Sequence, residues 1–345
     1  MSKSRPFASM HLGKYPCNPV AVATLAVTAL FALSGCAKIQ VKMGAKVYLA
    51  KLPVASIEVS QPKGPGIGPG QRSPLVVTVT QPDGKVLKTE GAGDGKVLWE
   101  DLKVESTVVA VNKKGIVSLS EDPRISDGKL PHLVITVPSH PDLHAELDIP
   151  LRYDYKFRAN FSGSSGSNGL SGSDGTSGMS GTPGSMDPEH PSAGGNGSDG
   201  GRGSDGSNGG SGENGRPVEL WVALRPGPHP LLQVSVLAEG KTRFFYLVDP
   251  HGGSLTVSSD GGSGGSGGKG GRGGRGGSGG IGTPNGSSGR DGSDGSDGMS
   301  GSSGRGGKIT VTYDPQVKPY LDAIHLSNSG GPKPVYYEGP VDPLW

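Results

Sequence analysis

The clearest alternation of apolar and polar residues runs from Leu143 to Phe161. Every odd position in this stretch is apolar or aromatic, and every even position is polar or proline. A period of two residues indicates a strand with one buried face. A second alternation runs from Ile39 to Leu49, again with the apolar residues at the odd positions. The pattern therefore predicts a half-buried strand at each end of a first folded domain, residues 36–161.

Shorter strand patterns lie between these two. They cover 57–59, 75–79, 86–87, 97–99, 107–111, 116–119 and 133–137. Turn sequences such as Pro82-Asp83-Gly84 separate them, and no window has a helical period with caps. Short strands at this spacing are typical of an antiparallel sandwich, so we expect an all-β fold with an immunoglobulin-like β-sandwich at 36–161. No cysteine pair or fixed tryptophan specifies true immunoglobulin topology.

A second group of strand patterns occupies 218–225, 231–238, 242–248 and 254–257. Turn residues separate these runs, which predicts a small four-stranded β-meander domain at 218–260. The C-terminal stretch 310–345 contains a short alternation and one more candidate strand around Ile324 to Leu326. Its last residues are rich in proline, and we expect them to be irregular.

Glycine recurs at every third residue in four tracts that flank the 218–260 domain. Tracts one and two occupy 162–217, and tracts three and four occupy 261–309. Each tract has eight register glycines, the first and last being Gly163 and Gly184, Gly194 and Gly215, Gly261 and Gly282, and Gly286 and Gly307. Residues 187–193 and Asn285 interrupt the period. Four tracts of equal length indicate a structural repeat, because a linker has no reason to keep count.

Three structures compete for this period. A collagen triple helix needs many imino acids, but the tracts contain only Pro183, Pro217 and Pro284. A flexible glycine and serine spacer needs no register. The third is an intrachain bundle of polyglycine-II helices, which resembles the snow flea antifreeze fold in its period only. It explains the equal lengths, because antiparallel neighbours must be equally long to pair all their amides. We expect this bundle, with a length of roughly 74 Å at ~3.1 Å per residue.

The residues between the register glycines predict how many neighbours each tract has. In tract three the residue after the register glycine is also glycine at seven of eight positions, and tract two has this at three positions. We therefore expect tracts two and three to have three neighbours each, and tracts one and four to have two. A short turn at residues 283–285 should make tracts three and four antiparallel. Arg275 should then lie near Asp294 and Arg272 near Asp297, within facing rows of opposite charge.

The N-terminal residues 1–35 have a different character. Basic residues and no acids precede an apolar run from Val20 to Leu33, which is shorter than the roughly 20 residues of a spanning helix. This pattern is typical of a secretory signal peptide. The residues Leu33-Ser34-Gly35-Cys36 then resemble the lipobox of bacterial lipoproteins.

That resemblance implies cleavage between Gly35 and Cys36 and acylation of Cys36, for example with palmitate. More than one acyl chain gives stable membrane attachment. Cys17 leaves with the signal, so Cys36 has no disulfide partner. Ala37 in the next position implies export to the cell outer membrane. The alternative is an unmodified cysteine that follows an ordinary signal peptide.

Composition and charge exclude several functions. Hydrophobic residues make up 32% of the chain, which argues against one large core, and a net charge of +2 argues against a nucleic-acid partner. His140 and His144, with Glu146 and Asp148 nearby, are residue types that bind metals, but their spacing fits a solvated strand face. The segment 194–199 matches only the start of a calcium-binding nonapeptide. We predict no catalytic residues, no metal site and no cofactor.

Two functions remain. The first is a non-enzymatic, membrane-anchored surface lipoprotein with a structural or adhesive role, in which the tracts form a stiff rod. The alternative is a module whose β-sandwich binds a ligand or an envelope protein or glycan partner, with the tracts as spacers.

Overall fold

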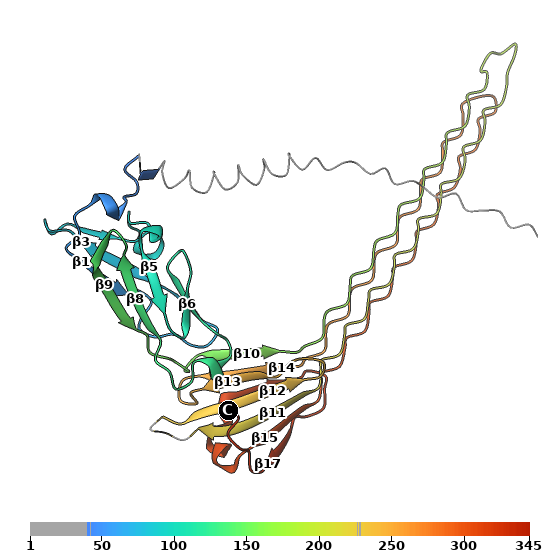
Figure 1. The fold of residues 1–345 in the computed structure, drawn as a ribbon. Helices are drawn as coiled ribbons and strands as arrows, with labels where there is room; N and C mark the ends of the chain where they lie inside the picture. The colour runs from blue at the N-terminus through green and yellow to red at the C-terminus, as the bar shows by residue number, and fades with distance from the viewer. Residues whose placement is uncertain (1–39, 42, 226, 228) are drawn as a thin grey trace, which may run out of the picture. The chain divides into compact units, whose positions relative to one another are not determined.

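The computed structural model describes residues 40–41, 43–225, 227 and 229–345 (Figure 1). Contacts divide the chain into two compact units. Unit one contains the described residues up to Ile67, Gln71–Leu119 and Lys129–Leu151. Unit two contains Gly68–Gly70, Ser120–Gly128 and Arg152–Trp345. Strands dominate both, which confirms the all-β prediction. The expected signal peptide, with cleavage at Gly35 and lipidation at Cys36, lies outside the described residues.

Unit one consists of three antiparallel sheets, each of three strands. Their orders are β1-β3-β4 (Ser56–Ser60, Val76–Thr80, Val86–Lys88), β2-β7-β6 (Arg72–Pro74, Ile116–Leu119, Val109–Val111) and β5-β8-β9 (Lys103–Ser106, His132–Val137, His140–Asp148). Alternate residues of these strands share one core, in which Val77, Val117 and Ile135 are fully buried. Three 3-10 helices connect the strands: η1 (Leu49–Lys51), η2 (Gly91–Gly93) and η3 (Trp99–Asp101). The immunoglobulin-like arrangement stays a prediction.

The strand expected at 39–49 is wrong for the described residues of that stretch. Gly44 has a left-handed φ of 72° and closes a turn, in which its N–H donates to Val41 O at 3.0 Å. Val47 makes only an isolated bridge with Val97, and Leu49 begins η1. Alternation alone was insufficient because the turn interrupts the extended backbone before a partner strand can pair with it.

Unit two has two sheets. The larger has the order β13-β12-β11-β15-β17, formed by Phe244–Val248, Leu231–Ala238, Val218–Arg225, Ile309–Tyr313 and Val335–Glu338. The smaller is parallel, with the order β10-β14-β16, formed by Lys156–Asn160, Ser254–Ser258 and Ile324–Ser327. Apolar residues of both sheets, such as Phe157, Leu255 and Val234, form one core. Two 3-10 helices, η4 (Pro123–Ile125) and η5 (Pro315–Ala323), complete the unit.

The shared core corrects three expectations about boundaries. The long strand at 143–161 is two strands, β9 and β10, which belong to different units. The four-stranded meander is also wrong, because β14 leaves β13 and pairs in parallel with β10. The tail 310–345 is not separate, since β16 and β17 extend the two sheets of the same sandwich. The main cause is that β10, β14 and β16, which the glycine tracts separate in the chain, bury apolar residues in one core.

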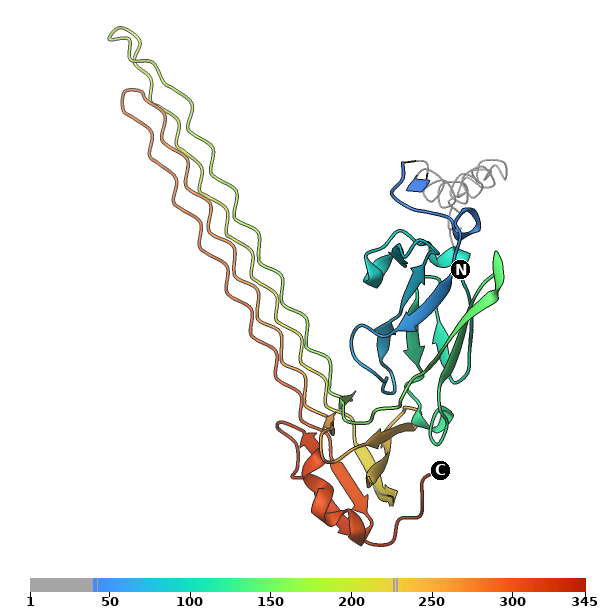
Figure 2. The same cartoon turned by 90° about the vertical axis from the view of Figure 1, so that its left-hand side faces the viewer.

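The four tracts connect the two sheets of unit two. Tract one follows β10 and tract three follows β14 in the smaller sheet, whereas tract two leads into β11 and tract four into β15 in the larger sheet. Figures 1 and 2 show the tracts as four long, gently wound lines side by side, closed by two hairpins at the far end. The register of the parallel strand pairs therefore sets the register in which the tracts that adjoin them begin.

Candidate functional site in the glycine tracts

Backbone hydrogen bonds join the tracts along their whole length. Tract one is parallel to tract three: Gly163 N–H donates to Asp260 O at 2.9 Å, and the same bond recurs at every register glycine up to Gly184. Tract two is parallel to tract four in the same way, from Gly194 to Gly215. The pairs one with two, two with three, and three with four are antiparallel.

Tracts two and three each bond to three other tracts, whereas tracts one and four each bond to two. This matches the arrangement expected from the glycine rows. A Cβ atom on Gly271 of tract three would lie 1.9 Å from Ser173 O of tract one, and one on Gly273 would lie 1.9 Å from Gly292 O of tract four. Both rows of tract three therefore have to be glycine because neighbouring backbone occupies the space.

The register of the strands continues into the tracts. Lys156 pairs with Ser254 in the smaller sheet, and the same offset of 98 residues separates Asn168 from Ser266, which are hydrogen-bonded farther along. Val218 pairs with Ile309 in the larger sheet, and its offset of 91 recurs between Asp205 and Ser296. The two offsets differ by the length of the 187–193 loop, which lies at the far end and leaves the register intact.

A recurring side-chain contact, which we call the Asx–Gly clamp, reinforces the parallel pairs. In each clamp an aspartate or asparagine accepts a hydrogen bond from the backbone N–H of one residue, and the next glycine donates to the carbonyl of that same residue. Asn208 Oδ1 lies 2.8 Å from Met299 N, and Gly209 N lies 2.9 Å from Met299 O. The seven clamped residues are Ser266 and Arg272 of tract three and Ser287, Arg290, Ser296, Met299 and Arg305 of tract four.

A second side-chain pattern lies between antiparallel tracts one and two. Where tract two has a serine after its register glycine, that hydroxyl accepts from tract one; Ser207 Oγ, for example, lies 2.7 Å from Leu170 N. Where tract two has glycine at this position, a hydroxyl of tract one occupies the space that a tract-two side chain would need. Thr176 Oγ1, for example, lies 2.9 Å from where a Cβ atom of Gly201 would be. Sequence reasoning missed this complementarity and the clamps, because neither is visible before the register is known.

The expected charge rows have the wrong partners. Tracts three and four are antiparallel, and their hydrogen-bonded glycines, such as Gly280 and Gly286, lie at equal distances from Thr283. This centre shifts the register by one triplet from the expected one, so Asp294 lies beside Arg272 instead of Arg275. Asp294 Oδ1 accepts from Gly273 N–H at 2.7 Å. Asp291 and Asp297 bond in the same way to Gly276 and Gly270. No ion pair joins these rows in the described chain.

The segments considered for metal binding occupy other roles. His144, Glu146 and Asp148 project from the exposed face of β9, where His132 of β8 joins them with Nδ1 2.8 Å from Asp148 Oδ1. Asn196 and Asp199 belong to clamps. Within the described part of the chain, no group of three or more histidine, cysteine or acidic residues is placed to hold a metal ion. No helix among the described residues is long and apolar enough to cross a membrane.

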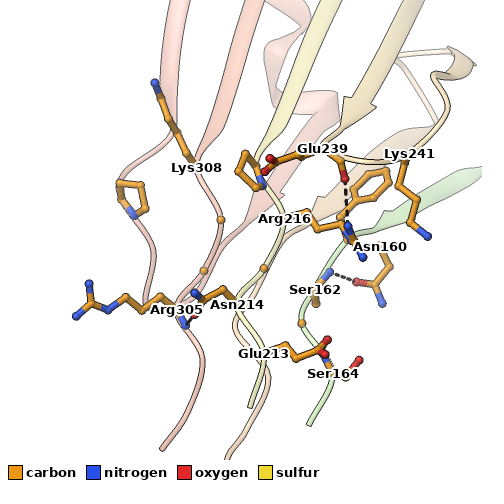
Figure 3. A pocket seen from close by; sticks show the side chains of 17 residues that line it. Asn160, Ser162, Ser164, Glu213, Asn214, Arg216, Glu239, Lys241, Arg305 and Lys308 are labelled. Atoms are coloured by element: carbon orange, nitrogen blue, oxygen red, sulfur yellow. Dashed lines mark hydrogen bonds between the residues drawn. The ribbon is translucent and has the colours of Figure 1, made fainter. Parts of the chain in front are cut away.

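A hollow of about 840 Å³ lies where the tracts meet the sheets of unit two (Figure 3). Arg216 Nη1 donates to Glu239 O at 3.2 Å on its wall, and Glu213 lies beside Ser164. The side chains of Lys241, Arg305 and Lys308 point in different directions in Figure 3. A small anion would require cations that converge on one point, and these do not.

Unit one has a hollow of its own, of about 650 Å³. Apolar and polar residues line it in equal number: Leu98, Trp99, Leu102, Val104 and Val111 are apolar, and Gln40, Glu90, Glu100, Asn112 and Lys113 are polar. Ligand sites are usually concave and combine apolar side chains with polar groups.

Searches of protein-family models and of curated protein sequences found no match to this chain.

Proposed function

We propose that the protein is a non-enzymatic lipoprotein of the cell envelope, whose four tracts form an intrachain polyglycine-II bundle that serves as a stiff structural or adhesive rod. The observation that supports the rod best is the ladder of backbone hydrogen bonds repeated at every triplet of all four tracts. A flexible spacer has no such ladder.

Three features support an assembly within one chain rather than a collagen-like trimer. The tracts bond to one another in both parallel and antiparallel pairs, whereas collagen winds three chains in one direction. Bare glycine rows face inward, where a Cβ atom would meet backbone. The outward rows of tracts one and four have side chains, which disfavours the addition of a fifth tract.

The stability of such a rod has to come from polar contacts. The tracts have almost no apolar core, and glycine loses more conformational entropy on ordering than other residues. Each backbone hydrogen bond contributes about 1 kcal/mol net, and the ladder makes these contributions cooperative. The sandwich of unit two holds both strands of each parallel pair in register, which removes much of the entropic cost of starting the ladder.

The anchor is proposed on the resemblance of Leu33-Ser34-Gly35-Cys36 to a lipobox, with cleavage after Gly35 and acylation of Cys36. The rod would then be tethered to the membrane, by inference the outer membrane, and would present its loops to an envelope protein or glycan partner. Cell fractionation tests this: Cys36→Ser should move the chain from the membrane fraction to the soluble fraction. Persistent membrane association of the processed variant would overturn the lipid anchor.

Small-angle scattering of the soluble Cys36→Ser chain tests the rod separately. An extended component of roughly 74 Å is expected for 24 residues at ~3.1 Å each. A scattering profile that fits only a flexible coil between folded units would reject the rod and favour the spacer.

The hollow in unit one supports the alternative function, a module that binds a ligand or partner. The apolar lining residues Leu98 and Trp99, beside polar ones such as Lys113, are the observation in favour. Replacement of the lining residue Lys113 by glutamate should abolish capture of an envelope component if this site carries the function. A Lys113→Glu variant that captures the same components as the wild type would reject this alternative.

A further inference from the structure

The repeat places glycine directly after every clamp asparagine, which creates Asn–Gly sequences. The tracts contain five: Asn168–Gly169, Asn196–Gly197, Asn208–Gly209, Asn214–Gly215 and Asn285–Gly286. Asn–Gly is the sequence most prone to spontaneous deamidation, because glycine leaves its own nitrogen sterically accessible. The asparagine of each pair is exposed to water, so burial of its side chain does not protect it.

Deamidation requires the glycine nitrogen to move toward the side chain of the preceding asparagine, and the hydrogen bonds of the tracts oppose this movement. The glycine nitrogen loses its proton and attacks Cγ of the preceding asparagine; the Cγ–Nδ2 bond breaks, and the nitrogen leaves as ammonia with a proton. Water then opens the succinimide at either carbonyl and gives aspartate or isoaspartate. Both the glycine N–H and the asparagine side chain must therefore be free to approach one another.

All five pairs are held at both reacting groups. Gly169 N–H donates to Ser266 O at 2.7 Å while Asn168 Oδ1 accepts from Ser266 N–H at 3.0 Å. The two reacting groups of Asn208–Gly209 are bound in the same way to Met299. In the turn pair, Asn285 Oδ1 accepts from Gly282 N–H and Gly286 N–H donates to Gly280 O, at 3.0 and 2.8 Å.

We infer that the five Asn–Gly pairs are modification sites, which the assembled tracts protect from deamidation and which opening of the tracts exposes. This inference rests on the proposed bundle. Conversion to aspartate keeps the side-chain acceptor, as Asp174, Asp199 and Asp205 already show in their own clamps. Isoaspartate adds a methylene to the main chain, which displaces every later glycine of the tract and prevents the clamp from closing again.

The same opening that frees the glycine nitrogen also exposes its N–H to solvent exchange. Deamidation of the folded chain should therefore be slowed by roughly the factor by which exchange of Gly209 N–H is slowed, at least about tenfold. The test incubates the full chain at mildly alkaline pH and measures by peptide mass spectrometry both deamidation at each asparagine and hydrogen exchange. The peptide Ser207-Asn208-Gly209-Gly210 supplies the unprotected rate.

A paired variant isolates the cause. Gly268→Ala places a methyl group 1.9 Å from Leu170 O, between tracts one and three and close to the Asn208 clamp. Deamidation at Asn208 and Asn168 should accelerate in this variant, while Ser300→Ala on the exposed surface of tract four should change neither rate. Wild-type deamidation at the peptide rate would overturn the inference. If hydrogen exchange is slow in that same sample, the proposed bundle stands and only the protection from deamidation is rejected. If hydrogen exchange is also fast, the proposed bundle is rejected as well.

Discussion

The carboxylate of Asp174 accepts a hydrogen bond from the backbone N–H of Arg272, at 2.8 Å, and makes no ion pair with the Arg272 guanidinium in the described structure. Asp174 lies in tract one and Arg272 in tract three. The side-chain oxygen takes the place that the carbonyl of a further tract would occupy in a larger array. Aspartate and asparagine thus complete hydrogen bonding at the surface of the tracts, and the charge of aspartate is not needed for it.

Asp174→Asn should therefore be nearly neutral, whereas Asp174→Ala should destabilise the tracts by about 1 kcal/mol, because Arg272 N–H loses its protein acceptor. Thermal melting and the exchange rate of the Arg272 amide provide the measurement. Equal loss of stability in the two variants would show that the charge, not the acceptor, is what matters.

Insertion of one serine after Gly270 should destabilise the rod far more than Arg272→Glu. The insertion rotates every later glycine of tract three out of its contact row, and a Cβ atom there meets neighbouring backbone, as at Gly274, where it would lie 2.0 Å from Thr176 O. The Arg272 side chain is exposed, and an exposed charge contributes only about 0 to 1 kcal/mol. Similar melting curves for the two variants would contradict the bundle.

The hydroxyl pattern between tracts one and two predicts a coupled pair. Gly201→Ser alone should crowd Thr176, whose Oγ1 lies 2.9 Å from the new Cβ position. In the double variant Gly201→Ser with Thr176→Gly, the introduced serine can accept from the tract-one amide as Ser204 does from Ser173 N–H, at 2.7 Å. A double-mutant cycle should give a favourable coupling energy of roughly 0.5 to 1 kcal/mol. Simple additivity would contradict the pattern.

Unit two should lose stability in alkali. Burial raises the pKa of Tyr153 and of Tyr246 to about 12, with smaller contributions from Asp127 and Glu121 respectively. Because the folded pKa lies above the unfolded value of about 10, the neutral phenols stabilise the fold fully below about pH 10, and this contribution is lost between about pH 10 and 12.

Tyr246→Phe should weaken that pH dependence, and Tyr337→Phe, at an exposed position of β17, serves as the control. Chemical denaturation across this pH range provides the measurement. An unchanged slope in Tyr246→Phe would contradict the assigned burial.

Sequence periodicity predicted the parts of the fold that depend on local pattern. It located the four tracts, and it placed tracts two and three at the crowded positions because a glycine row marks where a neighbour passes. It missed that β10 and β14 share a sheet, because nothing local relates Lys156 to Ser254. The clamps were missed for the same reason: an aspartate before a glycine suggests a charge, and only the register shows that a backbone N–H lies opposite it. The anchor at Cys36 stays a prediction.

Amide hydrogen exchange, resolved at single residues in the full chain, tests the central claim most directly. In tract three, Gly271 and Gly274 donate their N–H groups to tract two at 2.9 and 2.8 Å. In tract one, the N–H groups of Ser171 and Ser177 have no acceptor within the described chain and lie at an exposed surface. The bundle predicts slow exchange at Gly271 and Gly274 and fast exchange at Ser171 and Ser177. Equally fast exchange at all four amides would contradict the account and leave the tracts as a flexible spacer.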